Sequence, residues 1–64
     1  MGRAAKALFT AATACRAMAY QEGERAKVMS NPDMRRPIEN TAQRFAALAE
    51  KLEWARKGLK SNHR

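Results

Sequence analysis

The residues that break helices are concentrated in one short segment of this chain, residues 30–37, which reads Ser-Asn-Pro-Asp-Met-Arg-Arg-Pro. This segment favours a turn, because each proline pushes the residue before it out of the helical region of backbone space. Pro37 suits the first turn of a following helix, where its missing N–H costs nothing. The flanking stretches are rich in Ala, Leu, Met, Glu, Lys and Arg, which are strong helix formers. We therefore predict one helix over residues 3–29, a turn over 30–36, a second helix over 37–58 and a basic tail over 59–64.

Apolar residues recur with helical spacing on both predicted helices. In the second helix a large apolar residue recurs every seven positions from Ile38 to Leu59, and Thr41, Leu48 and Ala55 fill the positions between. This spacing produces a stripe down one side of a helix. Folding the chain at the turn pairs this stripe with one on the first helix and places small residues opposite large ones. The sequence therefore predicts an all-α fold, an antiparallel two-helix hairpin. The predicted seam consists of Leu8, Cys15, Ala19, Met29, Ile38, Phe45, Leu48, Leu52 and Leu59.

Glu22 is the one charged residue on the predicted seam, and it falls opposite Phe45. A carboxylate at such a position must reach solvent, pair with Arg25 or Arg44, or bind a ligand. The alternative is a slight rotation of the first helix, which would bring Met18 and Arg25 to the seam instead.

The chain is too short to bury a large core by itself. A domain of 64 residues buries only about 60% of the surface of its unfolded chain, so its stability is marginal. The first predicted helix also carries apolar residues away from the seam, and two helices cannot cover all of them. We expect the hairpin to be completed by self-association into a helical bundle, as a homo-oligomer when free, or by docking on a larger partner. The candidate apolar interface residues are Phe9, Met18 and Tyr20.

The net charge of +7 lies entirely in the two terminal segments. Residues 1–21 hold three basic residues and residues 54–64 hold four, and neither segment holds an acid. An antiparallel hairpin brings these segments together into one basic end, which suits phosphate groups. Alternatively, the charges favour a helix dipole or solubilise a tail, and Trp54 either stacks on a base or packs against a partner helix. The candidate partner- or anion-binding residues are Arg3, Lys6, Trp54, Arg56, Lys57, Lys60 and Arg64.

The residue inventory lacks the groups that catalysis requires. The chain holds one cysteine, Cys15, and one histidine, His63, so neither a disulfide framework nor a zinc site can form within it. We find no catalytic constellation, metal site or cofactor motif, and we expect a protein that is not an enzyme. No stretch approaches the ~20 apolar residues of a membrane span. A free thiol favours a reducing, cytoplasmic location. The basic, acid-free N-terminus leaves organellar targeting as the alternative.

Three functional hypotheses fit this pattern. The first is a small basic helical binding protein, an inhibitor or accessory factor that docks on a larger protein or nucleoprotein assembly. Its size and style are those of phage-encoded regulators. The second is a dimeric hairpin that binds nucleic acid through its basic terminal end. The third is a small structural subunit of a large complex.

Overall fold

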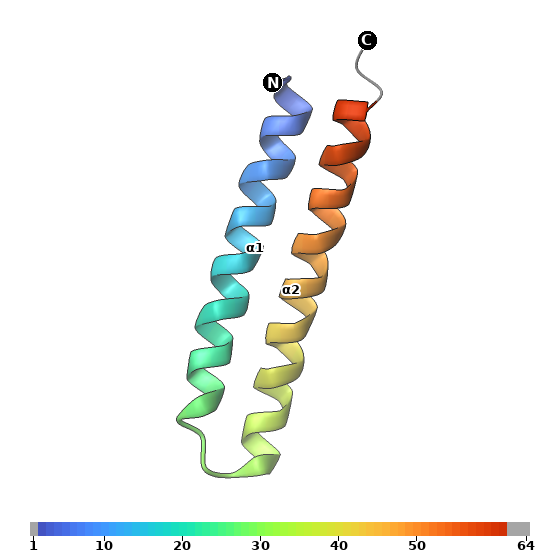
Figure 1. Ribbon diagram of the computed structural model, residues 1–64. Helices are drawn as coiled ribbons and strands as arrows, with labels where there is room; N and C mark the ends of the chain where they lie inside the picture. The colour runs from blue at the N-terminus through green and yellow to red at the C-terminus, as the bar shows by residue number, and fades with distance from the viewer. Residues whose placement is uncertain (1, 62–64) are drawn as a thin grey trace.

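The protein is a hairpin of two long helices. Its structure, a computed structural model, describes residues 2–61 of the chain and the side chains of residues 2–59. Helix α1 (Arg3–Lys27) and helix α2 (Pro32–Ser61) run antiparallel along their whole length and are joined by a short loop (Figure 1). The predicted all-α hairpin is therefore confirmed.

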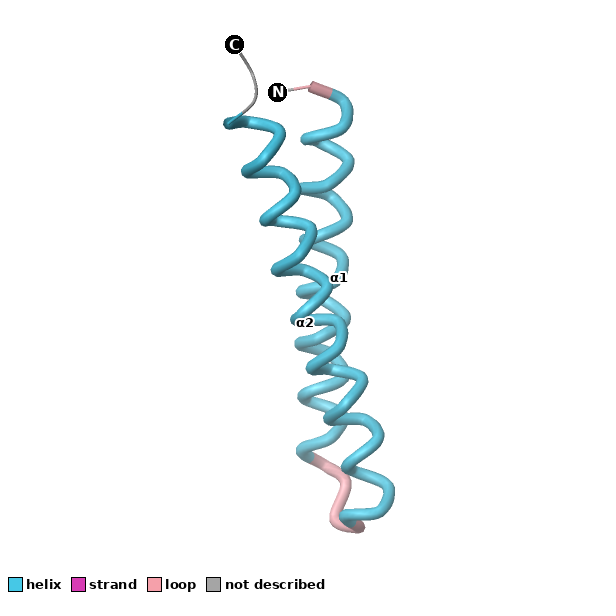
Figure 2. Tube along the Cα trace, turned by 90° about the vertical axis from the view of Figure 1, so that its right-hand side faces the viewer, coloured by secondary structure: helices cyan, strands magenta, loops and turns pink. Residues whose placement is uncertain are grey.

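The hairpin is a rod rather than a compact domain. Its principal extents are 52 × 13 × 10 Å, and Figure 2 shows α2 crossing α1 at a shallow angle. The Cα radius of gyration is 14.8 Å, whereas a compact domain of this length would have about 11 Å. Side chains in such a rod have a neighbouring helix on one side only.

The second helix begins at Pro32, so the prediction that it begins at Pro37 is wrong. The side chain of Asn31 caps the helix, because its Oδ1 atom accepts a hydrogen bond from the Asp33 N–H at 2.9 Å. Pro32 takes the first helical position, where the missing N–H is harmless. Pro37 lies inside the helix and cannot donate to the carbonyl of Asp33. Either proline suits the first turn of a helix. The side-chain cap that Asn31 provides sets the start of α2 at Pro32 rather than at Pro37.

The other helix ends also differ from the predicted bounds. Helix α1 ends at Lys27 rather than at residue 29, and it continues without a break through Gly23. Helix α2 passes Gly58 and extends to Ser61. The predicted tail over residues 59–64 is therefore helical in its first three residues.

Alanine forms the contact between the helices. The buried apolar residues of the described chain are Ala5, Ala12, Ala26 and Ala49, and none of its large side chains is fully buried. Successive ones on α1 are seven and fourteen residues apart, as expected for one line of contact. Because alanine has no side chain beyond Cβ, the two backbones can approach closely along this line.

The seam on α2 is rotated from its predicted position. Ala49 is 1% exposed, whereas Leu48 is 45% exposed and Leu59 is 44% exposed, so the prediction that both leucines belong to the seam is wrong. Between the large apolar residues of α2, the residues that face α1 are Ala42, which is half-buried, and Ala49, which is buried. Thr41 and Leu48 are exposed. Leucine at the contact line would hold the helices apart, and alanine does not. The remaining residues of the predicted seam are half-buried: Leu8, Cys15, Ala19, Met29, Ile38, Phe45 and Leu52.

Glu22 pairs with its own helix. Its Oε2 atom lies 3.4 Å from Nη1 of Arg25, and its side chain is 19% exposed. Met18 and the Arg25 side chain remain exposed at 39% and 61%. The helix is therefore not rotated toward Met18 and Arg25, and the ion pair with Arg25 accommodates the carboxylate.

Candidate functional site

Both ends of the described chain lie at the end of the hairpin opposite the loop (Figures 1 and 2). The side chains of Arg3 and Lys6 on α1 and of Lys57 on α2 are exposed in this half of the molecule. Among described residues none of the three has a carboxylate within ion-pairing distance. We term these three residues the terminal cations. Arg64 and the side chain of Lys60, which were predicted to join them, lie outside the described part of the chain.

Arg56 is held within the hairpin and does not belong to an open basic end. Its Nη2 atom donates a hydrogen bond to Oε2 of Glu53 at 2.9 Å, and its side chain is 17% exposed. The guanidinium carbon lies 5.4 Å from the ring centroid of Phe9, within the range of a cation–π contact. Arg56 thus ties α2 to α1. Its side chain is thus already paired, and its role in anion binding stays a prediction.

Glu53 connects the two helices on the same side. Its Oε1 atom lies 3.7 Å from Nη1 of Arg16 on α1, and its side chain is 17% exposed. The hydrogen bond from Arg56 lowers the pKa of the Glu53 carboxyl, and the charges of Arg56, Arg16 and Lys57 act in the same direction against partial desolvation. Sequence reasoning did not identify this group. The signal that could have identified the ion pair of Arg16 and Glu53 is their spacing from the contact line. Arg16 follows Ala12 by four residues and Glu53 follows Ala49 by four, which places both on the same side of the hairpin.

Trp54 lies on the outer side of α2, away from the seam. It is 76% exposed, so it does not pack between the helices. Lys51 and Lys57 are each three residues from it along the helix, the spacing of neighbours on a helix surface. Both lysines are exposed. The result is an open aromatic surface between two cations, of which sequence analysis identified Trp54 and Lys57 but not Lys51.

An apolar face covers part of the other side of the hairpin, and the ion pair of Glu22 and Arg25 lies on that side nearer the loop. The contact between Arg16 and Glu53 shows that the residues four after Ala12 and Ala49 share one side. The residues three after these alanines, Cys15 and Leu52, therefore share the opposite side. Neighbours at helical spacing extend this face in both directions along the hairpin. We define the apolar face as Leu8, Ala11, Cys15 and Met18 on α1 and Phe45, Leu48, Leu52, Ala55 and Leu59 on α2.

The three predicted apolar interface residues do not lie together. Met18 follows Phe9 by nine residues. At about 100° of rotation per residue, this separation places Met18 on the opposite side of α1 from Phe9. Met18 belongs to the apolar face, whereas one side of the Phe9 ring is covered by Arg56. Tyr20 is 70% exposed on the outer surface of α1. Only Met18 therefore lies where both helices contribute apolar surface.

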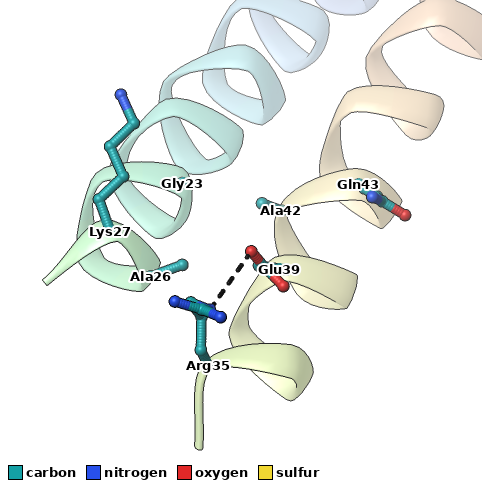
Figure 3. Close-up of a pocket in the computed structure, with 7 residues that line it drawn as sticks. All are labelled: Gly23, Ala26, Lys27, Arg35, Glu39, Ala42 and Gln43. Carbon is teal, nitrogen blue, oxygen red and sulfur yellow. Dashed lines mark ion pairs between the residues drawn. The ribbon is translucent and has the colours of Figure 1, made fainter. Parts of the chain in front are cut away.

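A shallow open hollow lies between the helices near the loop (Figure 3). It exists because Gly23, Ala26 and Ala42 are small. The charged groups around it are already paired, with Arg35 Nε 3.8 Å from Glu39 Oε2 and Lys27 Nζ 2.7 Å from Glu24 Oε2. The hydrogen bond to Glu24 raises the pKa of Lys27. The hollow therefore offers no free group for chemistry.

Other kinds of site are not found within residues 2–61. No three ligand-type side chains are grouped as a metal ion requires, and Cys15 is a free thiol. His63 lies outside the described residues. Neither described helix combines the length and apolar character needed to cross a membrane.

Comparison with known proteins gives no relative. No protein-family model matches the chain, and neither a curated protein nor a solved structure is significantly similar to it.

Proposed function

We propose that this chain is a non-enzymatic binding protein, a small basic accessory factor or inhibitor that docks on a larger nucleoprotein assembly through its terminal end. The observation that carries the proposal is the convergence of the terminal cations. Arg3, Lys6 and Lys57 come from opposite ends of the sequence and lie exposed in the same half of the rod. Cations that form no ion pair with a described carboxylate are available to an anionic partner. When free of this assembly, the hairpin associates with itself.

The second candidate, direct binding of nucleic acid, is favoured by the surface around Trp54. An exposed indole can stack on a base, and the lysines three residues to either side can reach the flanking phosphates. Because stacking and phosphate contacts carry little sequence information, such binding would discriminate poorly between sequences.

A salt titration tests the role of the terminal cations. The probe is a fluorescent single-stranded oligonucleotide, and the variant carries Lys6→Gln and Lys57→Gln. For each phosphate that the variant no longer neutralises, the slope of log affinity against log salt should fall by about 0.7. The matched control carries Arg36→Gln and Arg44→Gln, which remove the same charge from the loop half of the hairpin and should leave the slope unchanged. Helix propensity hardly changes in either variant, since Lys, Arg and Gln rank close together.

The outcomes separate the two candidates. Oligonucleotide binding that is weakened by Trp54→Ala and by the Lys6/Lys57 variant supports the nucleic-acid hairpin. Docking on protein is supported by a different set of results. The wild-type protein then does not bind the oligonucleotide but co-purifies with a protein complex that survives nuclease treatment, and the Lys6/Lys57 variant does not co-purify with that complex. Equal behaviour of the Lys6/Lys57 variant and its control in both assays overturns the role of the terminal cations.

A further inference from the structure

The apolar face has no described residue to cover it. Among the side chains that the structure describes, the buried apolar ones are all alanines. On the apolar face, Met18, Leu48 and Leu59 are 39%, 45% and 44% exposed. Large apolar side chains normally supply most of the free energy that folding gains from burial. In this chain the large apolar side chains are at most half-buried, so the remainder of that contribution becomes available only when something packs on the face.

The amount of surface agrees with one missing neighbour. The chain exposes 5248 Å², whereas a compact monomer of its mass exposes about 4100 Å². A standard protein interface buries about 800 Å² on each partner. Pairing two hairpins through this face would therefore bring the exposed area of each close to that of an ordinary folded protein.

The charge distribution permits a second copy as the occupant. A chain with a net charge of +7 repels another copy of itself wherever cations face each other. The apolar face carries no charged residue, so two copies can meet there without that repulsion. We propose that the free protein is a two-fold symmetric dimer, a four-helix bundle in which the apolar faces of two hairpins pack together. This inference specifies the interface of the self-association that belongs to the proposed function.

Repulsion between the terminal cations of the two copies favours one orientation of the pair. A two-fold axis along the hairpin would place both sets of terminal cations at the same end, and an axis across it places them at opposite ends. The second arrangement keeps like charges apart. It packs α1 on α1 and α2 on α2, with the axis near Cys15 and Leu52. Met18 then lies against Ala11 of the second copy, and Leu48 lies against Ala55, so large residues again meet small ones.

Mass measurements on matched variants test the interface. Light scattering after gel filtration at tens of micromolar should give twice the 7.2 kDa chain mass for the wild type. Leu48→Lys places a charge inside the interface twice per dimer and should weaken association at least ~100-fold. The control Ala47→Lys adds the same charge on the outer side of α2 and should leave a dimer. A wild-type chain of monomer mass, or equal dissociation by both lysine variants, overturns the proposed interface.

Helicity provides a second readout, should Leu48→Lys fail to fold. In the wild type and in Ala47→Lys, the thermal midpoint of circular dichroism should rise with protein concentration, because association and folding are linked. A wild-type midpoint that is independent of concentration overturns the dimer.

Cys15 tests the orientation, since it is the only thiol in the chain. A short bifunctional thiol reagent should join two wild-type chains through Cys15, because the two residues face each other near the proposed axis. The control combines Cys15→Ala with Tyr20→Cys, which moves the thiol to the outer surface, and should not cross-link. A dimer that does not cross-link through Cys15 overturns the antiparallel arrangement.

The experiments distinguish a failure of the proposed dimer from a failure of the proposed function. A monomeric hairpin whose oligonucleotide or assembly binding depends on Lys6 and Lys57 overturns the dimer alone. A dimer whose binding of the oligonucleotide or assembly does not depend on Lys6 and Lys57 overturns the docking role alone.

Discussion

At the scale of single residues, alanine decides how closely the two helices approach. Ala12 and Ala49 are 0% and 1% exposed, one on each helix. The large apolar residues beside them are at most half-buried. The contact line therefore depends on the absence of side-chain volume, and added volume there should be harmful.

Ala49→Leu should destabilise the hairpin by about 1–3 kcal/mol, because the larger side chain forces the helices apart. Ala47→Leu makes the same chemical change on the exposed side of α2 and should alter stability by less than about 0.5 kcal/mol. Thermal and urea unfolding followed by circular dichroism measures both. Equal stability of the two variants would contradict the alanine contact line.

Glu53 should make stability depend on pH. Its carboxyl pKa is lower in the folded chain than in the unfolded chain, chiefly because Arg56 donates a hydrogen bond to it. The ionised form therefore stabilises the fold above the ordinary carboxyl pKa of about 4.3, and this stabilisation is lost as the pH falls through the lowered value. The thermal midpoints of wild type and Glu53→Gln should differ most near neutral pH and converge in acid.

Glu50→Gln is the matched control for this comparison. Glu50 is exposed on the same helix and has no ion pair with any residue in the described part of the chain. Its variant should follow the wild-type curve at every pH. A Glu53→Gln variant that does the same would show that the contacts with Arg16 and Arg56 contribute nothing to stability.

At the scale of the elements, the start of α2 is set by a cap and not by proline alone. Asn31 accepts the Asp33 N–H, and the next two backbone N–H groups, those of Met34 and Arg35, reach the Asn31 carbonyl at 3.1 and 2.9 Å. The helix therefore begins five residues before the predicted start, and Pro37 is carried inside it at the loss of one backbone hydrogen bond.

Asn31→Ala should destabilise the hairpin by about 0.5–2 kcal/mol, since the first turn of α2 loses its side-chain acceptor. Asn31→Asp keeps an acceptor at the same place and should retain most of the stability. Asn40→Ala, an exposed asparagine within α2, serves as the control. The free energies of unfolding from urea titrations compare the three. An Asn31→Ala variant as stable as the control would remove the cap as the cause of the early start.

At the scale of the whole molecule, the rod concentrates positive charge in one half. The terminal cations, together with Arg16 and Arg56, lie there, and Glu53 is the one carboxylate paired with any of them among the described residues. Repulsion between these cations opposes the approach of the two helix ends.

Added salt should therefore stabilise the hairpin. Raising sodium chloride from about 0.01 M to 0.15 M shortens the Debye length from about 30 Å to 8 Å, which screens this repulsion. The thermal midpoint should rise over this range, and the rise should be smaller in the Lys6→Gln/Lys57→Gln variant than in the Arg36→Gln/Arg44→Gln control. A midpoint that falls with salt would mean that attractive ion pairs dominate.

The features that depend on local spacing follow from the amino-acid sequence alone. The seven-residue repeat from Ile38 to Leu59, the cluster of breakers between the helices and the acid-free ends suffice to predict two antiparallel helices with a basic end. These features need no knowledge of the partner helix, because helix periodicity and turn preferences are properties of the chain itself.

Which part of each stripe makes the contact depends on how the two helices pack. An apolar stripe on a helix is about 100° wide, so Ala49 and Leu48 are both within it, and only close packing against α1 selects the alanine. The same rotation turns Leu48 to the uncovered face and Glu53 toward Arg16. It also withdraws Arg56 from the basic end. A rotation of this size changes neither periodicity nor composition, which is why the sequence alone could not predict it.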